Sequence, residues 1–113
     1  MSGPAAPRKV SLDDVRPTVI GSQSFAARID LGLLKGVADP DLLGGPTPLT
    51  PDSRVFASIA EYPADKPGAP KFMGSAKMSV LNLVPYHHGV LTRIFIDWPQ
   101  PLAAAVDFLV IND

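Results

Sequence analysis

The chain has 113 residues, of which 46% are hydrophobic and 19% charged, and its formal net charge is -1. This length and composition fit one folded domain and exclude a wholly disordered chain. The near-neutral charge excludes the basic surface of a general nucleic-acid binder, and the absence of cysteine excludes disulfides, thiolate catalysis and zinc–cysteine sites.

Hydropathy along the chain gives no sign of secretion or of a membrane span. No apolar run near the N-terminus is long enough for the core of a signal peptide, and no segment approaches the roughly 20 apolar residues that a membrane span needs. We therefore expect a cytoplasmic or particle-associated protein with no membrane partner and no cofactor. Because the net charge is close to zero, repulsion between copies is weak and self-association is permitted.

Proline is the unusual component, since 13 of the residues are proline, where the average share is about 5%. Most of these prolines lie between runs in which apolar and polar residues alternate. Proline neither donates to a sheet ladder nor continues a helix, so its positions predict boundaries between strands.

Residues 1–15 predict a flexible N-terminal tail, and residues 16–113 predict a single domain. Within the tail, "SLDDV" (11–15) has the composition of one helical turn. The domain begins with a short strand near 16–20 and continues with "SQSFAARIDLGLL" (22–34), where strict alternation predicts a half-buried strand. The residues expected on its buried face are Phe25, Ala27, Ile29, Leu31 and Leu33.

Residues 35–53 form a long connection rich in glycine and proline, and Leu42, Leu43 and Leu49 predict that it packs across the end of the domain. A ligand-binding loop is the functional alternative for this segment. The strands that follow are predicted at 54–62, 73–84, 90–98 and 103–111. The sequence therefore predicts an all-β fold, an antiparallel β-sandwich of six strands (five to seven) of the jelly-roll, lectin-like or immunoglobulin-like kind.

Both histidines of the chain lie between two predicted strands, in "PYHHGV". Glycine readily takes the left-handed conformation that closes a three-residue hairpin loop, so Gly89 predicts such a loop with Tyr86 opposite Val90. The two prolines of "WPQPL" (98–102) predict a second hairpin, which would pair the last two strands of the chain.

This register gives the last three strands two apolar faces, the second one around an Arg93–Asp107 pair. The core face would carry Met78, Val80, Asn82, Val84, Val90, Thr92, Ile94, Ile96, Trp98, Ala104, Val106, Phe108 and Val110. The second face, predicted as the interface of a homo-oligomer, would carry Leu81, Leu83, Leu91, Arg93, Phe95, Asp107 and Leu109. A dimer or trimer would bury it, because large exposed apolar patches commonly mark interfaces. The alternative is that the 35–53 loop covers this face within one chain.

The paired histidines His87 and His88 predict neither a catalytic residue nor a metal site by themselves. Residues at a turn tip are usually solvated, and a catalytic metal needs about three converging ligands, which this hairpin does not supply. A trimer that gathers three copies of one histidine remains an alternative. Tyr86, His87 and His88 are the candidates for ligand contact. No nucleophile elbow or phosphate-binding loop is present, so we expect no enzyme activity.

The strand rhythm of residues 54–113, with "RVFASIAEY", "AKMSVLNLVPYHHGVLTRIFIDW" and "AAVDFLVIND", resembles that of the H-type lectin domain. The resemblance implies a six-stranded antiparallel sandwich that assembles as trimers or hexamers and binds sugars such as N-acetylgalactosamine. The closing strand of that family usually carries a tryptophan, which "DFLVIND" lacks, so no sugar-binding residue is carried over to this chain. A stacking platform of Tyr62 and Trp98 is a further alternative, although Trp98 falls on the predicted core face.

These observations predict a non-enzymatic structural or assembly module that self-associates, such as a subunit of a phage, virion or other particle. A carbohydrate-binding, lectin-like module with a glycan as its partner is the first alternative. A small enzyme or metal-binding protein that uses His87 and His88 is the second.

Overall fold

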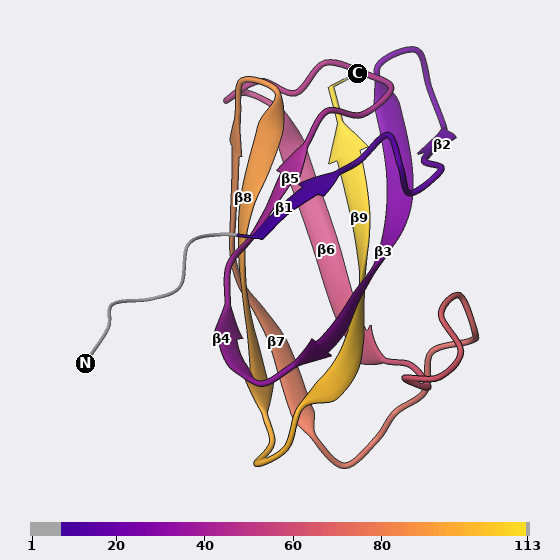
Figure 1. The fold of residues 1–113 in the computed structure, drawn as a ribbon. Helices are drawn as coiled ribbons and strands as arrows, with labels where there is room; N and C mark the ends of the chain where they lie inside the picture. Colours follow the sequence, from indigo (N-terminus) through magenta and orange to yellow (C-terminus); the bar gives the residue numbers. More distant parts are fainter. Residues whose placement is uncertain (1–7, 113) are drawn as a thin grey trace.

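The computed structural model describes residues 8–112, which form nine β-strands in two packed sheets and contain no helix (Figure 1). The predicted all-β sandwich is therefore confirmed. None of the described residues belongs to a helix that could cross a membrane.

Sheet 1 is centred on β8 (Gly89–Asp97), which pairs antiparallel with β7 (Lys77–Tyr86) on one side. On its other side, β4 (Gly36–Ala38) and β5 (Pro40–Leu43) follow one another along the strand. β1 (Arg8–Ser11) pairs parallel with β5, so this sheet is mixed.

Sheet 2 is antiparallel and contains the other four strands. Their order is β2 (Thr18–Val19), β3 (Ser24–Leu34), β9 (Leu102–Ile111) and β6 (Arg54–Glu61). β6 and β7, which are edge strands of the two sheets, lie close to each other. The core fills the space between the sheets and is built mainly from alternate residues of β3, β8 and β9.

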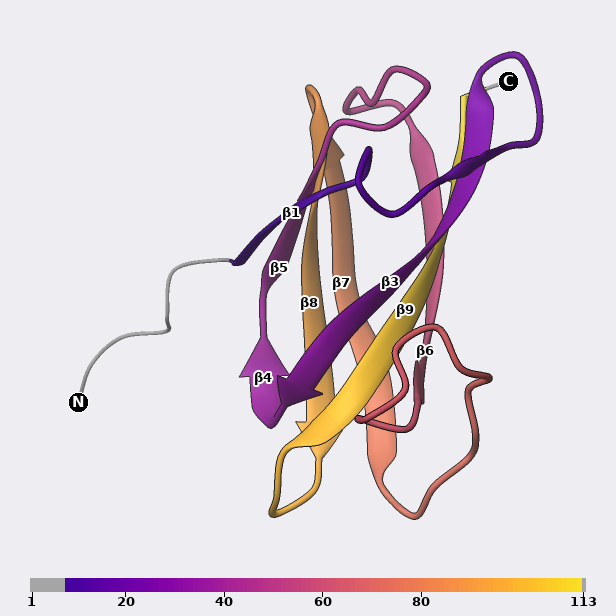
Figure 2. The same ribbon diagram turned by 45° about the vertical axis from the view of Figure 1, so that its right-hand side comes forward.

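β3 follows the predicted alternation as far as Leu31. Gly32, with a φ of 76°, then occupies a bulge in the pairing with β9. The bulge reverses the alternation, so Leu33 is exposed and Leu34 packs on the core, which corrects the prediction for Leu33. The chain leaves sheet 2 after β3 and enters sheet 1 as β4 (Figure 2). Gly36, the first residue of β4, is also left-handed, with a φ of 69°.

β8 and β9 lie in different sheets, so the prediction of a second hairpin is wrong. The connection between them crosses the sandwich, and β9 pairs with β3 and β6. The core side chains that were predicted side by side instead belong to opposite layers: Val90, Thr92, Ile94 and Ile96 on β8, and Ala104, Val106, Phe108 and Val110 on β9. Alternation determines which side chains of a strand are buried, but it leaves open which strand is its neighbour.

The β7–β8 hairpin closes with two residues, His87 and His88, so Tyr86 pairs with Gly89 rather than with the valine that follows. His88 takes the left-handed conformation predicted for Gly89, with a φ of 73°. Gly89 serves close packing instead, because a Cβ there would lie 2.8 Å from the carbonyl oxygen of Leu42.

Leu81 is the extra residue of a bulge in β7, between the pairs that Val80 and Asn82 form with β8. The shorter turn exchanges the faces of the second half of β7, and this bulge returns the first half to its predicted faces. Leu83 packs on the core, whereas Asn82 and Val84 are exposed on the outer side, which is the reverse of the predicted arrangement.

Residues 8–15 belong to the folded domain and are not a tail. β1 pairs with β5, and Leu12 is buried in the core. "SLDDV" forms a turn, in which the Asp14 amide donates to the Ser11 carbonyl oxygen at 3.2 Å, rather than a helix. Residues 1–7 of the predicted tail lie outside the described residues.

The long connection of residues 35–53 contains β4 and β5, which the sequence pattern did not reveal. Leu42 and Leu49 are buried in the core, as expected from their predicted packing. Because β4 and β5 pair along β8, this segment widens sheet 1 at its edge and does not lie over the sheet as a cover.

Candidate interaction surface

The outer side of sheet 1 carries a surface that we call face 1. Alternation along β8 turns Leu91, Arg93 and Phe95 outward, while the residues between them enter the core. Cross-strand pairing places Val84 opposite Leu91 and Val37 opposite Phe95. The residues of face 1 are Val37, Asp39, Leu81, Asn82, Val84, Leu91, Arg93 and Phe95.

The apolar side chains of face 1 are unusually exposed for residues of a sheet. Val37 is 60% exposed, Val84 51%, Leu81 46% and Leu91 45%. They come from three strands and lie on both sides of the Asn82–Arg93 row, so they form an apolar patch around a polar centre rather than scattered single residues. An apolar patch of this kind is typical of a surface that meets a partner.

Arg93 and Asp39 form a bidentate ion pair at the centre of face 1. The Arg93 Nε donates to the Asp39 Oδ1 at 2.8 Å, and its Nη2 donates to Oδ2 at 2.9 Å. These hydrogen bonds hold the pKa of the Asp39 carboxyl below its ordinary value of 3.8 and raise the pKa of Arg93. The pair is thus a charge-neutral unit at neutral pH, with both carboxylate oxygens bonded.

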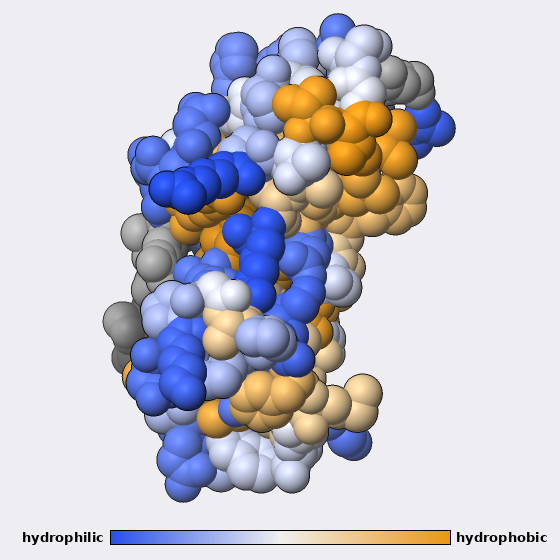
Figure 3. All heavy atoms as spheres, turned by 90° about the vertical axis from the view of Figure 1, so that its right-hand side faces the viewer, coloured by the Kyte–Doolittle hydropathy of each residue, from blue (hydrophilic) through white to orange (hydrophobic). Residues whose placement is uncertain are grey.

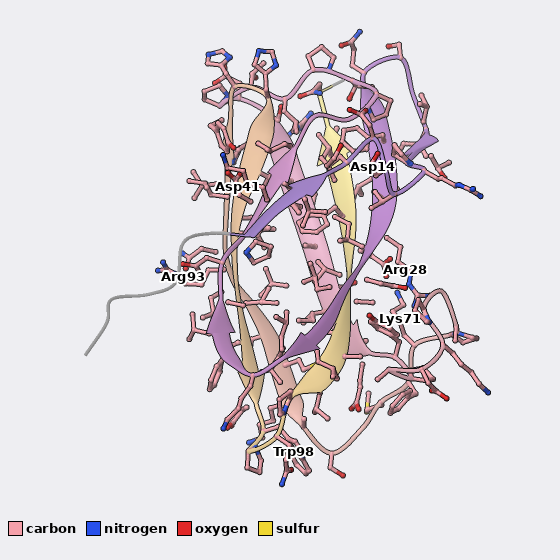
Figure 4. The ribbon with its side chains drawn as sticks, in the orientation of Figure 1. Asp14, Arg28, Asp41, Lys71, Arg93 and Trp98 are labelled. Atoms are coloured by element: carbon pink, nitrogen blue, oxygen red, sulfur yellow. The ribbon has the colours of Figure 1, made fainter. Side chains whose placement is uncertain are left out.

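Tyr86 and Asp41 form a second contact, between the β7–β8 hairpin and β5. The Tyr86 hydroxyl donates to the Asp41 Oδ1 at 2.6 Å, which, together with partial burial, raises the pKa of Tyr86 to about 12. Arg93 and Asp41 lie on the same outer side of β8 (Figure 4). The Tyr86 hydroxyl therefore already has a partner on β5, which makes it a poor candidate for ligand contact.

His87 and His88 are exposed at the hairpin tip, and the backbone of His88 is anchored to neighbouring loops. The His88 carbonyl accepts from the Gly44 amide at 2.9 Å, and the His88 amide donates to the Leu49 carbonyl at 3.1 Å. Within residues 8–112, no group of three His, Asp or Glu side chains is arranged to hold a metal ion.

A shallow hollow of about 390 Å³ lies within face 1. It is lined by Asp39, Asn82, Val84, Leu91, Thr92 and Arg93. Its two charged residues are bonded to each other, so the hollow offers apolar contact with a neutral polar rim. This composition is more typical of a macromolecular contact than of a site with free catalytic groups.

Four of the seven predicted interface residues lie on face 1: Leu81, Leu91, Arg93 and Phe95. Leu83 packs inside, and Asp107 and Leu109 lie on the outer side of sheet 2, because β9 belongs to that sheet. The predicted Arg93–Asp107 pair is therefore wrong. Arg93 binds Asp39, and Asp107 forms an ion pair with Lys71.

The sequence prediction missed Val37, Asp39, Asn82 and Val84. Val84 would have been placed on the outer side if the hairpin had been assigned a two-residue turn. Val37 and Asp39 lie in the glycine- and proline-rich connection, where only the outward alternation of Val37, Asp39 and Asp41 hinted at an edge strand.

The aromatic residues considered for sugar stacking lie apart from one another. Tyr62 is buried over Ala103 and Ala105, where its hydroxyl accepts from the Gly32 amide at 3.0 Å. Trp98 is 37% exposed at the β8–β9 connection, which corrects its predicted place in the core (Figure 4). These rings therefore do not form a common platform.

A charged cluster fastens residues 63–76 to the outer side of sheet 2. Asp30 accepts from the Gly68 amide at 2.7 Å and from the Arg28 Nε at 2.8 Å, and Lys71 pairs with Asp107. The Arg28 guanidinium lies over the Tyr62 ring at 5.7 Å from its centroid. The charges of this cluster are bonded to one another, so it is explained by its structural role.

Comparisons with protein-family models, with curated proteins and with solved structures found no match. The resemblance to the H-type lectin domain therefore stays a prediction from strand rhythm.

Proposed function

We propose that this protein is a non-enzymatic structural or assembly module that self-associates through face 1, such as a subunit of a phage, virion or other particle. The observation that carries the proposal is the patch of exposed apolar side chains from β4, β7 and β8 around the Arg93–Asp39 pair. Exposed apolar surface of this extent favours burial against a partner, at roughly 25 cal/mol for each Å² removed from water.

The size of the sheet supports this proposal. Strands that are about 4.8 Å apart and rise about 3.3 Å per residue give the outer side of sheet 1 at its widest, across β7, β8, β5 and β1, dimensions of roughly 20 Å by 30 Å. This is on the order of 600 Å², which approaches the roughly 800 Å² per partner of a standard specific interface. The outer side of sheet 1, of which face 1 is a part, therefore approaches the size of a specific contact.

The charges of face 1 favour a contact that buries them. An unpaired charge is costly to remove from water, but Arg93 and Asp39 satisfy each other through two hydrogen bonds. The net charge of -1 also leaves little repulsion between copies. A second copy of the chain is thus a suitable occupant.

A carbohydrate-binding role finds less support in the geometry. It would require aromatic rings exposed together in a groove, whereas Tyr62 is buried and Tyr86 is half-buried with its hydroxyl bonded. Glycan-array binding by the intact chain would favour that alternative over assembly.

Light scattering on the wild type and on Leu91→Asp tests the proposal. Leu91 is exposed, so the charge should leave the fold intact and abolish association. Met73→Asp is the matched control, because Met73 is 99% exposed in the segment before β7 and lies outside face 1. A monomeric wild type, or a Leu91→Asp variant that associates like the wild type, would refute the proposal.

A further inference from the structure

The outer side of sheet 2 carries a second apolar patch, which we call face 2. Pairing along β3, β9 and β6 places Ala26, Leu109 and Phe56 in one row. Ile111 lies in the next row, opposite Ser24, whose carbonyl accepts from the Ile20 amide at 3.0 Å. The residues of face 2 are Ile20, Ala26, Phe56, Leu109 and Ile111.

Face 2 is exposed and distinct from the charged cluster below it. Phe56 is 57% exposed and Ile20 54%, while Leu109 and Ile111 are half-buried beside them. The space-filling view of this side shows the apolar side chains gathered toward one end of the molecule, with charged side chains next to them (Figure 3). Faces 1 and 2 lie on the outer sides of opposite sheets, so they point away from each other.

The two faces differ in shape in a way that suits them to each other. Face 1 is hollowed at its centre, whereas face 2 presents an exposed aromatic ring. Two copies of face 1 placed together would leave a void between their hollows, and side chains that line a void lose contacts. An aromatic anchor in an apolar hollow is a common centre of a protein interface.

The polar groups around the two faces also permit the contact. The Arg93 side chain is 52% exposed at the rim of the hollow, and a guanidinium packs favourably against an aromatic ring. Its charge is already matched by Asp39, and beside face 2 Asp107 is matched by Lys71. The contact therefore buries no unmatched charge from these groups.

We propose that face 2 of one copy docks on face 1 of the next, with Phe56 inserted in the hollow beside Leu91 and Arg93. The proposal rests on the proposed function, since it names the surface that face 1 receives. Such a contact is heterologous, so each copy keeps one free face of each kind. Successive copies then continue as an open chain, or they close as a ring if the rotation allows.

Mixing two variants tests this arrangement directly. Leu91→Asp disrupts binding by face 1 and leaves face 2 intact, whereas Phe56→Asp disrupts binding by face 2 and leaves face 1 intact. In light scattering, each variant alone is expected to be monomeric, with its association weakened by roughly 30-fold or more. A mixture of the two should form a 1:1 dimer, because it contains one intact face of each kind. Met73→Asp should assemble like the wild type.

Other outcomes separate this inference from the proposed function. If Leu91→Asp is monomeric while Phe56→Asp assembles like the wild type, face 1 pairs with itself and the inference fails, although the proposed function stands. If Leu91→Asp assembles like the wild type, both fail. If each variant is monomeric and their mixture stays monomeric, the inference fails. Val84→Asp and Phe56→Ser repeat the test with other side chains should either variant not fold.

Discussion

Arg93 on β8 donates hydrogen bonds of 2.8 and 2.9 Å to the two carboxylate oxygens of Asp39, at the corner between β4 and β5. The pair joins the centre of sheet 1 to an edge that is otherwise held by two short strands. It thereby fixes the position of Val37 and the wall of the hollow in face 1.

This pairing predicts a stability that depends on pH. The pKa of Asp39 is lowered in the folded chain, so its contribution is present above the unfolded value of 3.8 and is lost as the pH falls through the lower folded value. Asp39→Asn should therefore unfold at a lower urea concentration than the wild type at neutral pH. The two midpoints should converge in strongly acid solution, and an equal difference at both pH values would contradict this account.

The Tyr86–Asp41 hydrogen bond predicts that the stability of the fold also depends on pH in alkaline solution. Because the pKa of Tyr86 is raised to about 12, its contribution is present below the unfolded value of 10 and is lost as the pH rises through about 12. Tyr86→Phe should cost about 1 kcal/mol of unfolding free energy at neutral pH. In an absorbance titration, the same substitution should remove a tyrosinate step near pH 12, and persistence of that step would assign it elsewhere.

The fold class and much of the core were predictable because alternation is a local signal. Phe25, Ile29, Ile94 and Val106 were all expected inside, and all are buried. The neighbours of each strand were not predictable in the same way, because the alternation within a strand does not indicate which other strand pairs with it. β8 and β9 were therefore placed side by side, although their buried faces belong to opposite sheets.

Which residues belong to face 1 depends on the length of the β7–β8 turn and on the bulge in β7. Amino-acid propensity predicts such local features poorly. Glycine was expected to take the left-handed position of the β7–β8 turn, but His88 takes it and Gly89 allows close packing. This change of one residue moved Leu83 inward and Val84 outward, whereas the bulge at Leu81 kept Met78 and Val80 on the predicted core face. The short strands β4 and β5 form because β8 offers them a free edge, which is a tertiary effect.

Thr92 predicts a stabilising substitution in the core. Its side chain faces the interior, and its Oγ1 is buried without a hydrogen-bond partner among the described residues. Thr92→Val replaces this hydroxyl with a methyl group of similar shape and should raise the unfolding free energy by about 1 kcal/mol. Thr18→Val, at an exposed position of β2, is the control and should change little. Equal urea midpoints for wild type and Thr92→Val would indicate a hydrogen bond at this hydroxyl.

Leu81 and Leu83 give the most direct test of the bulge, because they lie two residues apart and would share one face in a regular strand. In the structure Leu83 packs on the core, whereas Leu81 is 46% exposed on face 1. Leu83→Ala should therefore lower the unfolding free energy by about 2 kcal/mol, and Leu81→Ala by less than about 0.5 kcal/mol. Association should show the opposite order, since only Leu81 belongs to face 1. Similar losses of stability for the two variants would mean that β7 has no bulge and that Leu81 points inward with Leu83.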